Sequence, residues 1–217
     1  MIQHQKMNSP EYEHPYIAIS GPMGIGKTTV AKLVADRFEY YLLEENFAAN
    51  PFVAKAAADR DRYAFHSEVF FLMEKYGQII VAQERLKDKG VVQDTPIQQD
   101  VYSYGQALLQ GPEWNTYHNL YQALEPRLMK PSLIVCLEAN AEVHMERIRH
   151  RGRDFENAVT PDYLKQLTEF NYEWIRKSGI PTVYIQTDHL DIVNTTGAKI
   201  TMMDQIRSKL QSMNYKL

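Results

Sequence analysis

The chain has 217 residues, of which 44% are hydrophobic and 24% charged, and its formal net charge is −3. These values are typical of a globular protein of about one domain, and the absence of a strong positive charge argues against a dedicated nucleic-acid binder. The apolar runs are too short to cross a membrane, so we expect neither a nucleic acid nor a membrane as a partner.

The predicted elements begin after a polar stretch, residues 1–15, which has no apolar signal core and is expected to be a flexible tail. Residues 16–217 are then expected to form a single domain in which strands and helices alternate. The strands are expected at residues 16–20, 40–43, 91–94, 133–138 and 182–186. The helices are expected at residues 27–38, about 60–89, 100–109, 113–128, 141–149, 161–177 and 196–213. This order predicts an α/β three-layer sandwich: a five-stranded parallel sheet with helices on both faces, and ligands beyond the carboxyl ends of its strands.

The most specific motif joins the first predicted strand to the first helix. It fits G-x-x-x-x-G-K-[ST], the phosphate-binding P-loop, in which glycines let backbone N–H groups turn onto phosphate oxygens and the helix N-terminus favours anions. Lys27 is expected to reach the terminal phosphates, and the Thr28 hydroxyl to help hold Mg²⁺. The chain is therefore expected to bind a nucleoside triphosphate through Gly21, Met23, Gly24, Ile25, Gly26, Lys27, Thr28 and Thr29.

Acidic residues follow the second and third predicted strands. Glu44 and Glu45 come directly after the second strand, where a carboxylate can take a proton from an attacking hydroxyl. Asp94 ends the third strand, where P-loop proteins place an acid of the Mg²⁺ shell. Each could instead be a strand-end acid in solvent, but a P-loop in the same sheet favours the functional interpretation.

The fourth predicted strand contains the only cysteine, Cys136, in an apolar run where a buried thiol is the ordinary interpretation. A single cysteine allows no disulfide framework and no zinc-binding spacing, which is consistent with a reducing, cytoplasmic compartment.

Four arginines within residues 147–153 follow the fourth strand and run into Gly152. Guanidinium groups can neutralise the charge on a transferred phosphoryl group, and closure over the site would exclude water. We therefore expect a mobile lid at about residues 150–158, with a solvated charged face as the alternative.

These motifs, in this order, resemble the deoxynucleoside kinase family, which includes deoxycytidine, deoxyguanosine and deoxyadenosine kinases. The resemblance runs from about residue 16 to residue 193. It implies a P-loop NTPase-like fold with a five-stranded sheet and an arginine-rich lid, usually assembled as a homodimer. It also implies that ATP and Mg²⁺ support transfer of a phosphoryl group to the 5′-hydroxyl of a deoxynucleoside in nucleotide salvage.

The resemblance assigns roles by position. Glu45 matches the family's catalytic base, a match set by the Asn50-Pro51 pair that follows it, and Lys27 with the lid residues Arg147, Arg151 and Arg153 would balance the transferred charge. Arg147, Arg151 and Asp188 would also contact ATP, since residues 188–193 resemble the loop near the adenine. Asp100 resembles a base-contacting acid, Tyr104 the stacking aromatic residue, and Glu156 the acid at the sugar 3′-hydroxyl. The expected substrate-binding residues are Glu45, Phe47, Val53, Phe65, Glu68, Lys75, Asp94, Asp100, Tyr104 and Glu156.

Three positions depart from the family pattern. The family's Asp-Arg-Ser triplet reads Asp94-Thr95-Pro96, so the usual arginine is missing. The tyrosine that often contacts the 3′-hydroxyl falls at Ala57. The glutamine that commonly reads the base is Glu68, and the arginine two turns later is Lys75.

The third departure bears on the preferred base. An ionised glutamate only accepts hydrogen bonds, and guanine presents two adjacent donors, while Lys75 could donate to guanine O6. This favours deoxyguanosine, with deoxyadenosine next because Asp100 could accept from the adenine amino group. A broad specificity or a preference for pyrimidines stays open. It also stays open that Glu68 and Lys75 neutralise each other's charge on one helix and do not read the base.

Two other functions also stay open. A nucleoside monophosphate kinase of the thymidylate kinase type shares the P-loop and the lid, but it needs basic residues after the second strand, where Glu44 and Glu45 lie. A P-loop module that binds nucleotide without catalysis needs no base, so Glu45 argues against it, while the missing arginine beside Asp94 keeps it open.

Overall fold

The structure is a computed structural model that describes residues 13–153, 156, 159–188 and 195–215. Within these residues, five parallel strands form one sheet in the order β2-β3-β1-β4-β5. The strands are β1 (Tyr16–Ser20), β2 (Tyr41–Leu43), β3 (Val91–Asp94), β4 (Leu133–Glu138) and β5 (Thr182–Gln186). The predicted α/β class and parallel sheet are confirmed, and most of the predicted tail, with lid residues 154–155 and 157–158, lies outside the described residues.

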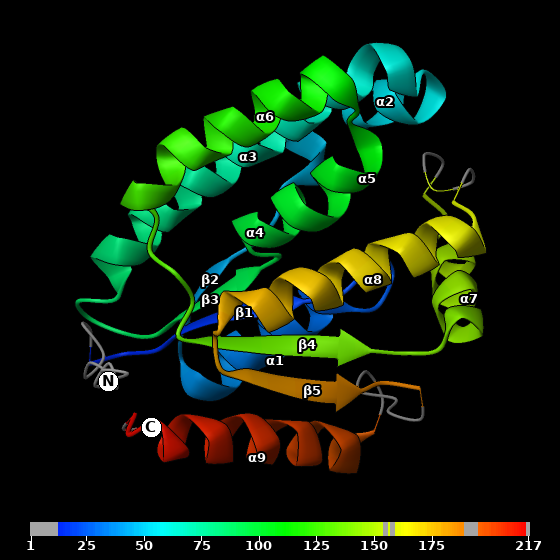
Figure 1. Ribbon diagram of the computed structural model, residues 1–217. Helices are drawn as coiled ribbons and strands as arrows, with labels where there is room; N and C mark the ends of the chain where they lie inside the picture. The colour runs from blue at the N-terminus through cyan, green and yellow to red at the C-terminus, as the bar shows by residue number, and fades with distance from the viewer. Residues whose placement is uncertain (1–12, 154–155, 157–158, 189–194, 216–217) are drawn as a thin grey trace, which may run out of the picture.

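Helices cover both faces of the sheet, with α1 and α9 below it and α3, α6 and α8 above it in the view of Figure 1. The helices are α1 (Lys27–Phe38), α2 (Val53–Ala58), α3 (Arg60–Arg85), α4 (Ile97–Gln99), α5 (Gln106–Leu108), α6 (Gly111–Leu124), α7 (Ala141–Arg151), α8 (Pro161–Ser178) and α9 (Thr196–Ser212). Shorter helical turns are the 3₁₀ segments η1 (Phe47–Ala49) and η3 (Glu125–Arg127) and the π-helix η2 (Asp100–Gly105). Within the described residues, none of these helices has the length and apolar content needed to span a membrane.

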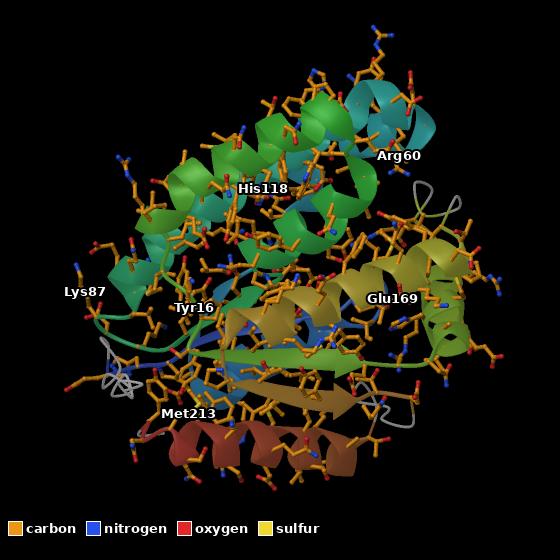
Figure 2. All side chains as sticks on the ribbon, in the orientation of Figure 1. Tyr16, Arg60, Lys87, His118, Glu169 and Met213 are labelled. Carbon is orange, nitrogen blue, oxygen red and sulfur yellow. The ribbon has the colours of Figure 1, made fainter. Side chains whose placement is uncertain are left out.

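Residue alternation along the strands explains why both faces are covered. Ile17 and Ile19 of β1 belong to a buried cluster with α1 and α9, whereas Tyr16 points to the other face, against the end of α3. In β4, Cys136 packs on that second face against Trp174 of α8, which confirms a buried thiol. Successive strand residues point to opposite faces, so near-continuous apolar strands require a helical layer on each side. Side chains fill the space between the sheet and both layers (Figure 2).

Several predicted helix boundaries differ from the structure, and α2 was not predicted. The helix expected at residues 113–128 is α6, which ends at Leu124 and is followed by η3. The helix expected at about residues 60–89 ends at Arg85, because the apolar spacing stops at Leu86 and a polar turn leads to β3. The helix expected at residues 100–109 consists of α4, η2 and α5 in succession, with a π-helix in the middle. A π-helix is a rare local change of helical register that is frequent at functional sites. It brings Asp100 and Tyr104, which are four residues apart, to one side of the segment.

Candidate active site

The P-loop lies between β1 and α1, and its glycines are required by geometry. Gly26, the residue before α1, has a φ of 106°, which favours glycine. Gly24 has a φ of 79°, and a Cβ there would lie 2.4 Å from Ile148 Cγ1 of α7. The loop therefore approaches the arginine-bearing helix more closely than any side chain at position 24 would allow.

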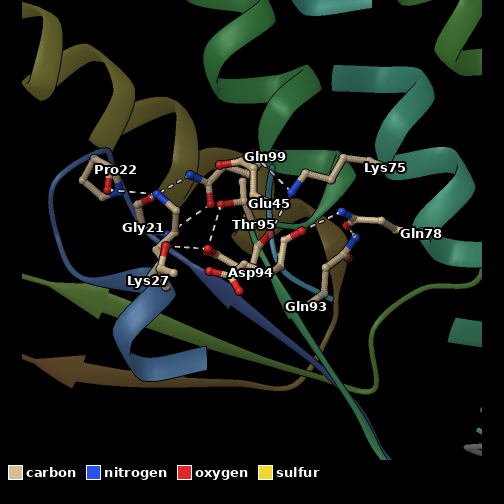
Figure 3. A network of polar contacts seen from close by, with 12 residues as sticks. Gly21, Pro22, Lys27, Glu45, Lys75, Gln78, Gln93, Asp94, Thr95 and Gln99 are labelled. Carbon is tan, nitrogen blue, oxygen red and sulfur yellow. Dashed lines mark hydrogen bonds and ion pairs between the residues drawn. The ribbon is translucent and has the colours of Figure 1, made fainter. Parts of the chain in front are cut away.

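Lys27, the first residue of α1, closes the P-loop on itself (Figure 3), and the next residue, Thr28, ties α1 to the end of β3. Lys27 Nζ donates to the carbonyl oxygens of Gly21 at 2.8 Å and Pro22 at 3.2 Å. Thr28 Oγ1 donates to Asp94 Oδ2 at 2.6 Å. Burial lowers the pKa of Lys27, against the opposing effect of the Asp94 and Glu45 carboxylates. A hydroxyl and a carboxylate in contact provide the hard oxygen ligands that Mg²⁺ prefers.

Gln99 of α4 clamps the start of the P-loop, a role that no sequence motif indicated. Its Oε1 accepts from the Gly21 N–H at 3.1 Å, and its Nε2 donates to the Gly21 carbonyl at 2.6 Å. Ser20 Oγ donates toward Gln99 Oε1 at 2.8 Å. Gln99 is fully buried, so its amide replaces water at both backbone groups of Gly21.

Gln99→Leu is expected to lower both the free energy of unfolding and the affinity for ATP. Leucine fills the space but leaves the buried N–H of Gly21 unpaired, at roughly 1–3 kcal/mol, and leaves the Gly21 carbonyl with Lys27 as its donor. Urea unfolding and ATP titration of the variant measure the two effects. The exposed Gln106→Leu is the control, and equal effects of the two substitutions would contradict the assigned clamp.

Glu45 follows β2 and lies beside the buried ammonium of Lys75 from α3. Glu45 Oε1 is 3.2 Å from Lys75 Nζ, and Lys75 Nζ also donates to the backbone carbonyl of Asp94 at 2.7 Å. The Glu45 side chain is 7% exposed and reaches the cavity, whereas the Lys75 side chain is fully buried behind it. In the structure the Lys75 ammonium therefore pairs with Glu45, whereas the sequence analysis expected it to contact the base.

Two buried carboxyl groups also line this cavity. Glu68 of α3 and Asp100 of η2 are 5% and 4% exposed, and burial raises the pKa of each well above its ordinary value. The negative charge of Asp100 adds to the effect on Glu68, while the Lys75 ammonium opposes it for Asp100. Within the described residues, Asp100 Oδ2 is buried without a hydrogen-bond partner. Such an atom suits a ligand that donates hydrogen bonds, and the tyrosines Tyr104 and Tyr163 line the same cavity.

The arginine cluster extends over the end of α7 and the residues that follow. Arg151 Nε donates to Glu156 Oε2 at 3.0 Å, and Arg153 Nη1 lies 3.8 Å from Glu156 Oε1. Arg147 instead donates to Thr187 Oγ1 at 2.8 Å, to the Thr187 carbonyl at 2.7 Å and to the Ile25 carbonyl at 3.3 Å. Arg147 thus ties α7 to the P-loop and to the end of β5, whereas Arg151 and Arg153 converge on Glu156.

One cavity of about 1600 Å³ joins these parts. Nearly all residues expected at the site line it: Met23, Gly24, Ile25, Gly26, Lys27, Thr28, Thr29, Glu45, Phe47, Val53, Glu68, Asp94, Asp100, Tyr104, Arg147, Arg151, Arg153, Glu156 and Asp188. Three expected residues do not line it: Gly21, Phe65 and Lys75. Gly21 is held by Gln99, and Phe65 packs against a core cluster between α3 and α6. Residues 189–193 of the expected adenine loop lie outside the described residues.

Some cavity residues were not expected from the sequence. Arg60 starts α3 and donates through Nε to the Leu108 carbonyl at 3.3 Å, which holds α3 to the end of α5. Tyr163 lies in the first turn of α8, where its backbone N–H donates to the Thr160 side chain that caps the helix. Arginine before a helix and tyrosine within one are common, so only the folded arrangement identifies these two residues as part of the cavity.

The chain is similar to known proteins in sequence and in fold. A family model described as deoxynucleoside kinase matches residues 17–211. A deoxyguanosine kinase of Bacillus subtilis is 32% identical over 155 residues, which cover 70% of this chain and 74% of that protein. A deoxyadenosine/deoxycytidine kinase of the same organism is 25% identical over 207 residues, covering 92% and 95%. A solved structure of deoxyadenosine kinase from M. mycoides with bound dATP superposes with a TM-score of 0.74 at 20% identity, covering 90% of this chain and 99% of that one.

Proposed function

The chain belongs to the deoxynucleoside kinase family, and from this premise we propose that it transfers the γ-phosphoryl group of ATP to the 5′-hydroxyl of a purine deoxynucleoside. The observation that carries this proposal is the position of Glu45. It lies in the same cavity as the P-loop and the carboxyl groups of Glu68 and Asp100. A nucleoside whose base contacts these carboxyl groups would present its 5′-hydroxyl to Glu45, since the sugar joins the base to the reacting oxygen.

In this mechanism Glu45 takes the proton of the 5′-hydroxyl as the oxygen attacks the γ-phosphorus, and the bond to the β-phosphate oxygen breaks to release ADP. Lys27 and the N–H groups of the P-loop hold the transferred phosphoryl group. Arg151 and Arg153, which line the same cavity, balance its negative charge. Release of these arginines from Glu156 would free its carboxylate to accept from the sugar 3′-hydroxyl.

Thr28 and Asp94 would hold Mg²⁺, because their oxygens already meet at the carboxyl end of β3 beside the P-loop. When bound, the ion neutralises charge on the β- and γ-phosphate oxygens. Chelation of divalent cations is therefore expected to stop turnover, and added Mg²⁺ to restore it.

The base preference that we propose is deoxyguanosine first and deoxyadenosine second. Glu68 and Asp100 can accept from the N1–H and the 2-amino group of guanine, and Asp100 Oδ2 has no hydrogen-bond partner among the described residues. The Bacillus subtilis relative that is 32% identical to this chain is a deoxyguanosine kinase, which supports the same order.

Phosphorus NMR of a reaction containing ATP, Mg²⁺ and deoxyguanosine tests the proposal. We expect a 5′-phosphomonoester and ADP to appear in equal amounts. Inorganic phosphate in place of the phosphomonoester would show that water is the acceptor. ATP binding without any product would indicate a nucleotide-binding module without catalytic activity. The comparisons above support neither that alternative nor a thymidylate-type kinase.

We further propose that the enzyme forms a homodimer through α3. Met73, Ile80 and Val81 of this helix are exposed, and large apolar side chains on a surface favour association. Sedimentation velocity is expected to give twice the mass of one chain, and a monomer at micromolar concentration would contradict this proposal.

A further inference from the structure

Lys75 is the most deeply buried cation near the site, and the proposed mechanism gives it no role. Its side chain has no exposed surface and does not line the cavity, although it comes from α3, the helix that carries Glu68. An ammonium group without access to water is costly unless carboxylates and hydrogen-bond acceptors surround it. Burial alone would lower the pKa of Lys75, but Glu45, Asp100 and Asp94 outweigh burial and raise it.

The two contacts of this ammonium join the ends of two strands. Lys75 Nζ lies 3.2 Å from Glu45 Oε1, after β2, and donates at 2.7 Å to the Asp94 carbonyl at the end of β3 (Figure 3). The side chain of the same Asp94 accepts from Thr28 of the P-loop. A single buried cation thus connects the proposed base to the strand end that faces the phosphates.

The peptide group between Asp94 and Thr95 is held at both of its polar atoms. Its carbonyl accepts from Lys75, and its N–H donates to the Ile19 carbonyl of β1 at 3.2 Å. Thr95 has a φ of 64°, a conformation that a β-branched residue rarely adopts. Surrounding contacts must impose such a conformation, and the Lys75 hydrogen bond is one of the two that fix this peptide.

We propose that Lys75 is a positioning residue that holds the Glu45 carboxylate in register with the P-loop. In the family pattern an arginine follows the acid at position 94, but this chain has the uncharged Thr95 there. The ammonium that pairs with Glu45 comes instead from Lys75 of α3. The inference rests on the proposed function, because it assumes that Glu45 is the base. A displacement of the base by about 1 Å can cost on the order of 10²-fold in rate, and Lys75→Met is expected to lower kcat by about that factor.

The expected pattern of this loss distinguishes positioning from base recognition. A residue that acts through Glu45 lowers kcat equally for deoxyguanosine and deoxyadenosine and leaves the KM for each nucleoside nearly unchanged. A residue that donates to guanine O6 would instead raise the KM for deoxyguanosine alone. Methionine preserves most of the volume of the lysine stem and removes the charge.

A double-mutant cycle tests the coupling directly. Rates of Lys75→Met, Glu45→Gln and the double variant are measured by single-turnover transfer from labelled ATP, with ATP affinity and Tm as folding controls. Lys32→Met is the matched control, because Lys32 pairs at 2.6 Å with the exposed Glu44, the neighbour of Glu45. Such surface pairs contribute little, so this control is expected to keep wild-type kcat.

The inference is supported if Lys75→Met costs about 10²-fold in the wild-type background and little in the Glu45→Gln background. An equal loss in both backgrounds, or a loss confined to the deoxyguanosine KM, would overturn it while leaving Glu45 as the base. Wild-type kcat in Glu45→Gln would instead reject the proposed mechanism. If Lys75→Met does not fold, the Tm of Glu45→Gln tests the inference in its place. This substitution is expected to lower Tm, because it leaves the buried ammonium of Lys75 without its carboxylate partner. An unchanged Tm would overturn the inference.

Discussion

Glu45→Gln is expected to lower kcat by about 10²–10⁴-fold, the usual contribution of a positioned general base. Glutamine preserves the size of the side chain and cannot accept the proton of the 5′-hydroxyl. ATP binding through the P-loop is expected to persist, because Lys27 and Thr28 are unchanged. Steady-state kinetics with deoxyguanosine, together with ATP titration, separates loss of chemistry from loss of binding.

The adjacent Glu44→Gln is the matched control for this experiment. Glu44 is exposed and pairs with Lys32 on the surface, so its loss is expected to leave kcat within a few-fold of wild type. If Glu44→Gln abolished turnover and Glu45→Gln did not, the roles that we assign to the two acids would be reversed. If both variants kept full activity, neither acid would be the base.

Glu68→Gln is expected to shift the preference from deoxyguanosine toward deoxyadenosine. An amide offers one donor and one acceptor, which matches the adenine edge, whereas guanine would meet an N–H group with its own N–H donors. At a pH above the raised pKa of Glu68, loss of a hydrogen bond to its charged carboxylate costs about 1.5–3 kcal/mol, so the ratio of kcat/KM values measured there should fall by roughly 10- to 100-fold. Glu84→Gln, an exposed position on the same helix, is the control and is expected to leave the ratio unchanged.

The raised pKa of Glu68 adds a pH dependence to the same ratio. Burial raises this pKa first, and the charges of Asp100 and Glu45 add to it. Below its pKa the carboxyl group is protonated and, like an amide, offers a donor and an acceptor; above it the carboxylate only accepts. The preference for deoxyguanosine over deoxyadenosine is therefore expected to increase with pH. In Glu68→Gln the ratio of the kcat/KM values for deoxyguanosine and deoxyadenosine should depend less on pH, and only the contribution of Asp100 should remain. A pH dependence of this ratio that the substitution leaves unchanged would contradict the role assigned to Glu68.

The sequence predicted that the residues around the P-loop lie in one cavity, because their signals are local. The P-loop spacing, the acid after β2 and the acid at the end of β3 each depend on a few neighbouring residues, and parallel strands bring their carboxyl ends together. The arginines after β4 follow the same logic, and Arg151 and Arg153 meet Glu156 within a few residues.

The contacts that the sequence did not predict connect distant segments. Gln99 holds Gly21 across 78 positions of the chain, and neither residue carries a signal for the other. Helical spacing places Lys75 two turns beyond Glu68, but it does not say where a long side chain ends. In the structure the ammonium reaches Glu45, because that carboxylate and the Asp94 carbonyl both lie within hydrogen-bonding range.

The ionisation state of Glu68 also depends on the fold. The sequence analysis took Glu68 to be ionised and to act only as a hydrogen-bond acceptor, as a carboxyl group in water does at neutral pH. Burial on α3 beside Asp100 raises its pKa, so the same residue can present either hydrogen-bonding pattern. The base preference that we propose therefore depends on an electrostatic environment that no local motif indicates.

Initial rates of phosphoryl transfer from Mg²⁺-ATP to deoxyguanosine, deoxyadenosine, deoxycytidine, thymidine and thymidine monophosphate test the central claim most directly. We predict the highest kcat/KM for deoxyguanosine, a lower value for deoxyadenosine, and no transfer to thymidine monophosphate. If thymidine monophosphate were the best acceptor, or if no nucleoside were phosphorylated while ATP still bound, the account of one cavity joining base, sugar and phosphate through Glu45 would be contradicted.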